Sequence, residues 1–180
     1  HEMVEKYLNG EELNFLNKYG DPQYDTDIWQ MFLRFVEFWE TYKPKLIETE
    51  VHLFSDELKV AGTCDLICEI DGKLWLLDVK TSNMMHNTYE LQTCVYGQCY
   101  KECYGVDIEN YGILWLKSSK RRLNKEKMTG KGWEVVMPER TQEENLEIFK
   151  MVKRLFDIEN PQDAPTFTEF KTTVKRDFTS

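Results

Sequence analysis

The chain has 180 residues, 41% of them hydrophobic and 31% charged, which is typical of a folded globular protein and not of a disordered one. Its 32 acidic residues outnumber the 23 basic ones and give a formal net charge of -9, which argues against a protein that holds nucleic acid through a generally basic surface. No apolar run reaches the ~18 residues of a membrane span, and an odd number of scattered cysteines argues against a secreted disulfide framework, so we expect a cytoplasmic protein with no membrane association.

The hydrophobic spacing and the turn residues divide the chain into a series of helices and strands. In chain order the patterns predict two helices (1–18, with a break near Asn9-Gly10, and 26–42), three strands (46–54, 58–70 and 74–80), a helix (87–104), two strands (111–116 and 133–137) and a last helix (141–156). No linker or repeat divides this series. We therefore expect a single α/β domain over residues 1–180, in which a central mixed sheet with a three-strand meander is flanked by helices. Because the chain begins at His1 without a methionine, we also expect residues upstream of it to be missing.

The strongest local signal is Asp71-Gly72 between two strand-like runs, because a two-residue type I′ turn needs positive φ at both positions. This turn pairs Ile70 with Lys73 and fixes the register of the hairpin. Carried back along the strands, the register sets Asp65 directly opposite Asp78. Like charges opposed across a strand pair are destabilising, so the arrangement favours a divalent cation between them. A solvated strand end with an incidental register is the structural alternative.

Other polar residues converge on this hairpin. Strict alternation along residues 47–53 puts Glu48, Glu50 and His52 on one face of the preceding strand. Lys80 projects from the same face as Asp78, where it could neutralise part of the charge or orient a water. On the following helix, a glutamine and a tyrosine four residues apart share a face, Gln92 and Tyr96.

In this order the motifs resemble those of the RecB-like branch of the PD-(D/E)XK nucleases. The family pattern is an upstream Glu, GxxD, DxK and QxxxY, and the matching residues are Glu50, Gly62–Asp65, Asp78–Lys80 and Gln92–Tyr96. The first eight residues also resemble the N-terminal helix of the family, which begins with a metal-binding histidine. DxK alone is short and common, but four ordered motifs on the expected strand, strand and helix are specific. The resemblance covers about residues 1–116 and implies a restriction-endonuclease-like core.

The resemblance implies a metal-dependent phosphodiesterase acting on DNA. The implied ligands of Mg²⁺ or Mn²⁺ are the carboxylates of Asp65 and Asp78, the carbonyl of Val79 and the ring of His1, with Glu50 joining through a second metal or a water. Hard oxygen ligands suit Mg²⁺, which polarises the phosphate and lowers the pKa of bound water. The histidine and the glutamate each have a rival along the chain, since His52 could replace His1 and Glu48 could replace Glu50.

The resemblance also assigns roles outside the metal ligands. Lys80 would position or activate the attacking water and stabilise charge that develops at phosphorus. Gln92 and Tyr96 would hold the DNA strand or organise Lys80. A basic loop between two strands is then interpreted as a phosphate-contacting arm, with Lys117, Lys120, Arg121, Arg122, Lys125 and Lys127 in eleven positions. A merely solvated loop is the alternative.

The cysteines are predicted to be structural. The hairpin register puts Cys64 on the same apolar face as Leu66 and Cys68, and Cys94, Cys99 and Cys103 lie on the helix that follows. Some RecB-like nucleases hold an iron–sulfur cluster with one upstream cysteine and a C-terminal group of three. No cysteine follows Cys103 in this chain, so we expect no cluster and small core residues instead.

The function that these observations predict is a metal-dependent deoxyribonuclease, an exonuclease of recombination or repair in a bacterial or phage-infected cell, where the biological setting rests on family analogy alone. A non-catalytic DNA-binding or assembly module that retains the fold is the alternative, and an RNA nuclease is a third possibility. A homo-oligomer or a recombination partner protein is open at this point.

Overall fold

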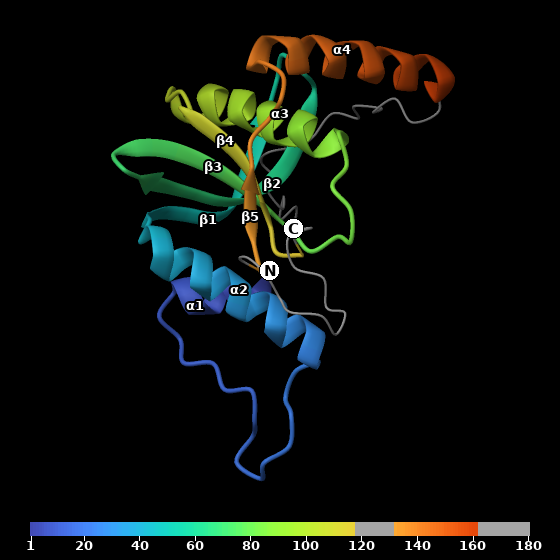
Figure 1. Cartoon of the computed structure of the whole chain (residues 1–180). Coiled ribbons are helices and arrows are strands. Elements are labelled where there is room, and N and C mark those ends of the chain that lie inside the picture. Colours follow the sequence, from blue (N-terminus) through green and yellow to red (C-terminus); the bar gives the residue numbers. More distant parts are fainter. Residues whose placement is uncertain (118–131, 162–180) are drawn as a thin grey trace, which may run out of the picture.

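The computed structural model describes residues 1–117 and 132–161 (Figure 1). Its elements are α1 (Glu2–Leu8), α2 (Thr26–Tyr42), β1 (Lys45–Ser55), β2 (Val60–Ile70), β3 (Lys73–Lys80), α3 (Thr88–Tyr104), β4 (Asn110–Trp115), β5 (Glu134–Val136) and α4 (Gln142–Glu159). This is the predicted order of helices and strands. The first predicted helix is too long, however, because only residues 2–8 are helical.

The loop that replaces the second half of that helix contains residues that favour turns. Gly10 has φ 82°, a conformation that ends a helix easily. Further along, the Asn17 side chain accepts hydrogen bonds from the backbone N–H groups of Tyr19 and Asp21, at 2.8 and 3.0 Å. A bridge between Leu16 and Pro22 closes this turn. Apolar residues at helical spacing were therefore misleading where asparagine and glycine set the local backbone.

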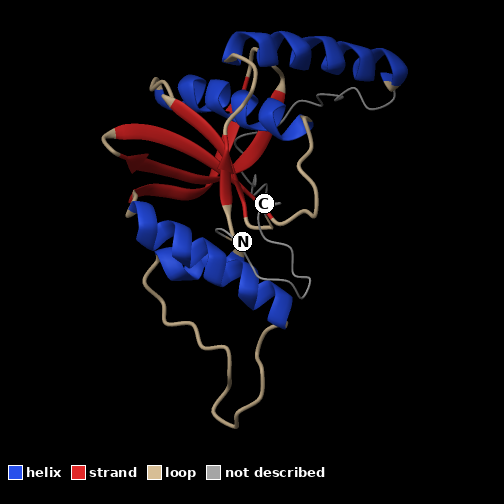
Figure 2. Cartoon of the chain, in the orientation of Figure 1, coloured by secondary structure: helices blue, strands red, loops and turns tan. Residues whose placement is uncertain are grey.

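The sheet has the strand order β1-β2-β3-β4-β5. β1, β2 and β3 form an antiparallel meander, β3 and β4 are parallel, and β5 is antiparallel to β4, so the sheet is mixed as predicted. Figure 2 shows the helices on both faces, with α1 and α2 on one and α3 and α4 on the other. The crossover from β3 to β4 is α3, which places that helix directly after the DxK strand.

Each layer of helices buries its own apolar cluster against the sheet. On the α2 side, Phe35 and Phe38 are fully buried against Leu66, Leu77 and Val79 of the sheet. Burial of each such side chain contributes about 1.5–3 kcal/mol. On the α3 side the cluster is formed by Val51, Leu53, Cys64, Ile67, Leu76, Val95, Cys99, Tyr100 and neighbours. These two clusters hold β2 and β3 rigidly from both faces.

All five cysteines are free thiols, and Cys64, Cys68, Cys94 and Cys99 are buried, as the prediction of core residues requires. Cys103 departs from the prediction because it is only partly buried, with its thiol donating to the Phe54 carbonyl at 3.4 Å. Burial raises the pKa of Cys94 and of Cys99 to about 11, so both are held as inert thiols at neutral pH. Among the described residues, no helix has both the length and the apolarity needed to cross a membrane.

Candidate metal centre and active site

The β2–β3 hairpin follows the predicted register as far as Leu66↔Leu77, and beyond this pair the two strands separate. We call this point of separation the fork. Asp71 and Gly72 have φ 52° and 76°, as a type I′ turn demands, and the pairing runs from Ile70↔Lys73 to Leu66↔Leu77. There the ladder ends, so Asp65 and Asp78 are not the directly opposed pair that the register predicts. Instead, Asp65 Oδ2 accepts a hydrogen bond from the Val79 backbone N–H at 2.7 Å, in place of a strand carbonyl. β2 continues with β1 and β3 with β4, and the carboxylates lie where they separate.

The alternation of side chains also reverses at this point. Ile67 packs on the α3 side and Leu66 on the α2 side, but Cys64 packs on the α3 side again, so the prediction that Cys64 shares a face with Leu66 was wrong. The alternation of side chains reverses on β1 as well, since Thr49 pairs with Leu66 on the α2 side while Val51 pairs with Cys64 on the α3 side. The residue between them has an unusual backbone.

That residue is Glu50, whose φ is 50°, in the left-handed region that side chains other than glycine rarely adopt. Its conformation separates the three residues predicted on one face of β1. Glu48 pairs with Ile67, on the α3 side. His52 pairs instead with Thr63, and its ring Nδ1 shares a hydrogen bond of 3.0 Å with the hydroxyl of that residue. Such backbone strain occurs preferentially where a functional side chain is aimed. Here it aims Glu50 towards the fork.

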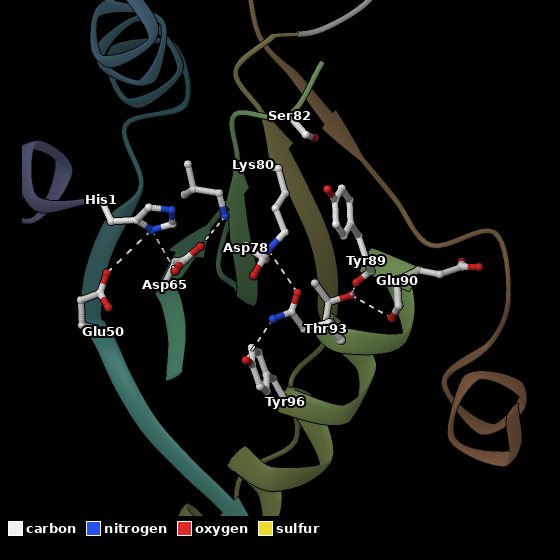
Figure 3. Close-up of polar contacts among 12 residues, drawn as sticks. His1, Glu50, Asp65, Asp78, Lys80, Ser82, Tyr89, Glu90, Thr93 and Tyr96 are labelled. Carbon is white, nitrogen blue, oxygen red and sulfur yellow. Dashed lines mark hydrogen bonds and ion pairs between the residues drawn. The ribbon is translucent and has the colours of Figure 1, made fainter. Parts of the chain in front are cut away.

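Three side chains from three elements meet at the fork. His1 Nδ1, at the start of α1, lies 3.1 Å from Asp65 Oδ1 and 3.9 Å from Glu50 Oε1 (Figure 3). One ligand atom from each of His1, Glu50 and Asp65 lies within 4.8 Å of the other two, a spacing that suits a metal ion. Neither rival belongs to this group of three. His52 lies close enough to Glu50 to lower its pKa, but it is bonded to Thr63, and Glu48 faces the α3 side.

Asp78 lies at the buried end of the same site. Its side chain is 3% exposed, against 51% for His1, so the site runs from a closed end on β3 to an open end at α1. Asp78 Oδ2 forms an ion pair with Lys80 Nζ at 2.7 Å. The structure therefore places Asp78 beside the group of three, with its carboxylate directed at the lysine.

A chain of hydrogen bonds from α3 holds Lys80. Lys80 Nζ donates to Gln92 Oε1 at 3.1 Å, and Gln92 Nε2 donates to Tyr96 OH at 3.0 Å. Gly62 lets this chain exist, because a Cβ at that position would lie 2.7 Å from both Cε1 and OH of Tyr96. The Tyr96 ring thus rests on the backbone of β2 where a side chain would obstruct it. Gln92 and Tyr96 organise Lys80 in this structure, one of the two roles considered for them.

Sequence reasoning missed Tyr89. Lys80 Nζ lies 5.0 Å from the centre of the Tyr89 ring, within reach of a cation–π contact. A signal was present, because Tyr89, Gln92 and Tyr96 follow the i, i+3, i+7 spacing of one helix face. The start of α3 is fixed in turn by Glu90, whose carboxylate accepts a hydrogen bond from the backbone N–H of Glu139 at 2.9 Å and pairs with Arg140.

Burial and like charges destabilise the charged forms of two acidic side chains in the site. Burial raises the pKa of Asp78, a shift that Lys80 opposes and the charge of Asp65 increases. Burial also raises the pKa of Glu50, and Asp65 adds to it. The hydrogen bond with Asp65 raises the pKa of His1. Converging carboxylates with raised pKa values favour an additional cation, and oxygen donors with one imidazole fit Mg²⁺ or Mn²⁺. The residues present therefore fit a divalent metal.

Most of the predicted basic arm lies outside the described residues, including Lys120, Arg121, Arg122 and the lysines at 125 and 127. Lys117 is described, and its Nζ donates to Asn83 Oδ1 at 3.2 Å. This contact ties the end of the β4 segment to the loop after β3.

Comparisons with known proteins agree with the family and the fold that the sequence predicts. The profile of the PD-(D/E)XK nuclease superfamily matches residues 2–177. No curated protein matches the chain at a significant level. Among solved structures, a candidate exonuclease from Eubacterium rectale aligns with a TM-score of 0.51 at 14% identity, over 99% of this chain and 75% of that one. The structure of SSO0001 aligns with a TM-score of 0.36 at 16% identity, over 78% and 61%. The chain belongs to the PD-(D/E)XK nuclease superfamily.

Proposed function

We propose that this nuclease is a Mg²⁺- or Mn²⁺-dependent deoxyribonuclease that acts as an exonuclease in recombination or repair. The observation that carries the proposal is the meeting of His1, Glu50 and Asp65 within 4.8 Å, beside the Asp78–Lys80 pair. Members of the superfamily generally use divalent metals. The E. rectale protein, a candidate exonuclease, supports the exonuclease assignment only by likeness of fold.

In this proposal the open and buried ends of the site have different tasks. His1, Glu50, Asp65 and Asp78, with the carbonyl of Val79, would hold the metal. When bound, a divalent ion would supply a Lewis acid for the phosphate and lower the pKa of the attacking water. Asp65 is fixed in place by the backbone N–H of Val79, which leaves its other oxygen directed at His1.

Lys80 supplies the positive charge that the protein itself brings to the reaction. Its side chain is only 22% exposed, and Asp78 and Gln92 fix the position of its ammonium group. A cation held in a partly buried site stabilises the charge that develops on a phosphate oxygen better than the same cation in water. The neighbouring Tyr89 ring excludes water from one side of it. Gln92 and Tyr96 thus act by holding the lysine as well as by any contact with the nucleic acid.

Cleavage assays on a set of substrates test the proposal. Linear, circular, single-stranded and duplex DNA, and RNA of the same sequence, are incubated with Mg²⁺, Mn²⁺ or EDTA. We expect metal-dependent degradation of linear DNA, with circular DNA resistant. Lys80→Ala should abolish it, whereas Lys73→Ala, an exposed lysine at the other end of β3, should not. Full activity of Lys80→Ala would contradict the mechanism, and DNA binding without cleavage by the wild type would indicate a non-catalytic module.

A further inference from the structure

A basic hollow lies between the β1–β2 turn and the second half of α4, away from the metal ligands. It has a volume of about 330 Å³ and is lined by Lys59, Lys150, Lys153 and Arg154, together with Glu57 and Asp157. Four cations against two carboxylates give this hollow a local positive excess, in a chain whose formal net charge is -9. The surface is therefore a candidate for binding an anionic partner.

The scaffold does not account for these cations. Lys150 pairs with Glu57 at 2.8 Å, Lys153 with Asp157 at 2.7 Å and Lys59 with Asp56 at 3.9 Å, but pairs of this kind at the surface contribute only about 0–1 kcal/mol and exchange easily for other anions. Within the described residues, Arg154 has no ion-pair partner. The last turn of α4 contains no basic residue, so the cations do not serve to complement the C-terminal end of the helix dipole.

The hollow continues towards the active site. A second cavity of about 330 Å³ is lined by Gln92 and Tyr96, which hold Lys80, and by the apolar side chains of Leu91, Val95 and Phe149. Phe149 of α4 lines both cavities, so the two are neighbours. Figure 1 shows α4 lying over α3 on the same side of the sheet, which is the side from which Gln92 and Tyr96 reach Lys80. The two cavities are therefore adjacent on the α3 side, and we call the surface that they form together the path from the active site to the basic hollow.

We propose that the path from Gln92 and Tyr96 across Phe149 to the four cations binds the nucleic-acid strand that extends from the metal site. The inference rests on the proposed nuclease function for the class of partner. Phosphates seek Lys and Arg and give a salt-dependent affinity. An apolar section with aromatic residues suits the sugars and bases between them, which such surfaces bind without sequence preference. The net charge of the chain is thus compatible with nucleic acid because its charges are segregated.

Binding without cleavage tests this surface. In the full chain, Lys150→Gln with Arg154→Gln removes two cations of the hollow. The matched control is Lys45→Gln with Lys101→Gln, two exposed lysines that are paired with Glu69 and Asp107 away from the path. The probe is a fluorescently labelled single-stranded oligonucleotide in EDTA, followed by anisotropy across about 50 to 200 mM salt. We expect the double variant to bind about tenfold more weakly and the slope of log K against log salt to fall by about 1.4, with the control unchanged.

Several outcomes would overturn the inference. They are a wild-type affinity and salt slope in the double variant, an equal loss in the control, or tighter binding of an acidic peptide than of the oligonucleotide. Thermal melting checks folding, and the single variant Arg154→Gln breaks no described ion pair if the double variant is unstable. Because binding is measured in EDTA, a wild type that binds through this surface but cleaves nothing with Mg²⁺ or Mn²⁺ would defeat the proposed function and leave the inference standing.

Discussion

Carboxylates in two regions of this protein have opposite surroundings. Glu102, on α3, accepts hydrogen bonds from Ser55 Oγ at 2.7 Å and from the Asp56 backbone N–H at 3.0 Å, and the bond from Ser55 lowers its pKa. Glu50 and Asp78, at the fork of the sheet, have a raised pKa, chiefly because of burial. Hydrogen-bond donors stabilise the charged form of Glu102, whereas Glu50 and Asp78 have too few donors to offset the cost of burying their charges.

The difference teaches what the site lacks. A protein can tolerate a buried carboxylate by giving it donors, by protonating it, or by adding a cation. Glu102 is exposed, and the hydrogen bonds from Ser55 and Asp56 are sufficient to stabilise its charge. At the fork it provides His1 and Lys80 and no further cation among the described residues, while three acidic side chains converge there. A divalent ion would complete the balance.

The largest effect is expected from Asp65→Asn. This change removes the carboxylate that contacts His1, while an amide oxygen can still accept the hydrogen bond from Val79. We expect the rate of cleavage to fall at least about 10³-fold and the metal-induced rise in Tm to disappear. Single-turnover cleavage and melting with and without Mn²⁺ measure both. A variant that keeps the metal-induced rise in Tm would show that Asp65 is not a ligand.

The two histidines at the start of the chain and on β1 form a matched pair for the next test. His1→Ala removes a group 3.1 Å from Asp65 and should weaken Mn²⁺ binding by at least about 10- to 100-fold, the loss that removal of a residue supporting a metal ligand already causes. His52→Ala removes a ring that is bonded to Thr63 and should leave the affinity unchanged. Calorimetric titration with Mn²⁺ distinguishes them, and the reverse order would make His52 the ligand.

The buried end of the site should respond in kcat and not in metal affinity. Tyr96→Phe removes the hydroxyl that anchors Gln92, and Gly62→Ala pushes the Tyr96 ring away from β2. We expect both to lower kcat, by about tenfold, because Lys80 loses part of its support, while the Kd for Mn²⁺ stays the same. Steady-state rates and metal titrations on both variants check this. Equal losses in kcat and in the affinity for Mn²⁺ would show that the buried end and the open end of the site do not act independently.

The fork also marks the limit of what sequence could predict. The register of the β2–β3 hairpin was predictable because Asp71-Gly72 permits one turn type, and it is confirmed as far as Leu66↔Leu77. It failed at Asp65, where a side chain replaces a backbone acceptor, an exchange that no pairing rule anticipates.

On β1 the sequence contains no signal for the positive φ of Glu50, since side chains other than glycine rarely adopt it. Alternation therefore grouped Glu48 and His52 with Glu50, although the structure puts the two rivals on opposite faces. Several of the motif residues lie together in the structure, and what escaped prediction was the backbone irregularity that brings them together.

The smallest effect is a pair of stability changes of opposite sign. Because the folded-state pKa of Glu50 is raised, the metal-free folded protein holds that proton more tightly than the unfolded chain, so stability is lost as pH rises from the ordinary carboxylate pKa through the raised one. In EDTA at neutral pH, Glu50→Gln should therefore raise Tm. Glu102 has a lowered pKa, which contributes stability above the ordinary carboxylate pKa that is lost as pH falls through the lowered value, so Glu102→Gln should reduce Tm at neutral pH. Both differences should vanish in acid, below all of these pKa values.

With saturating Mn²⁺ the Glu50→Gln variant should become the less stable protein, because the missing ligand reduces the stabilisation by bound metal. A variant that stays more stable than the wild type in Mn²⁺ would show that Glu50 does not bind the metal.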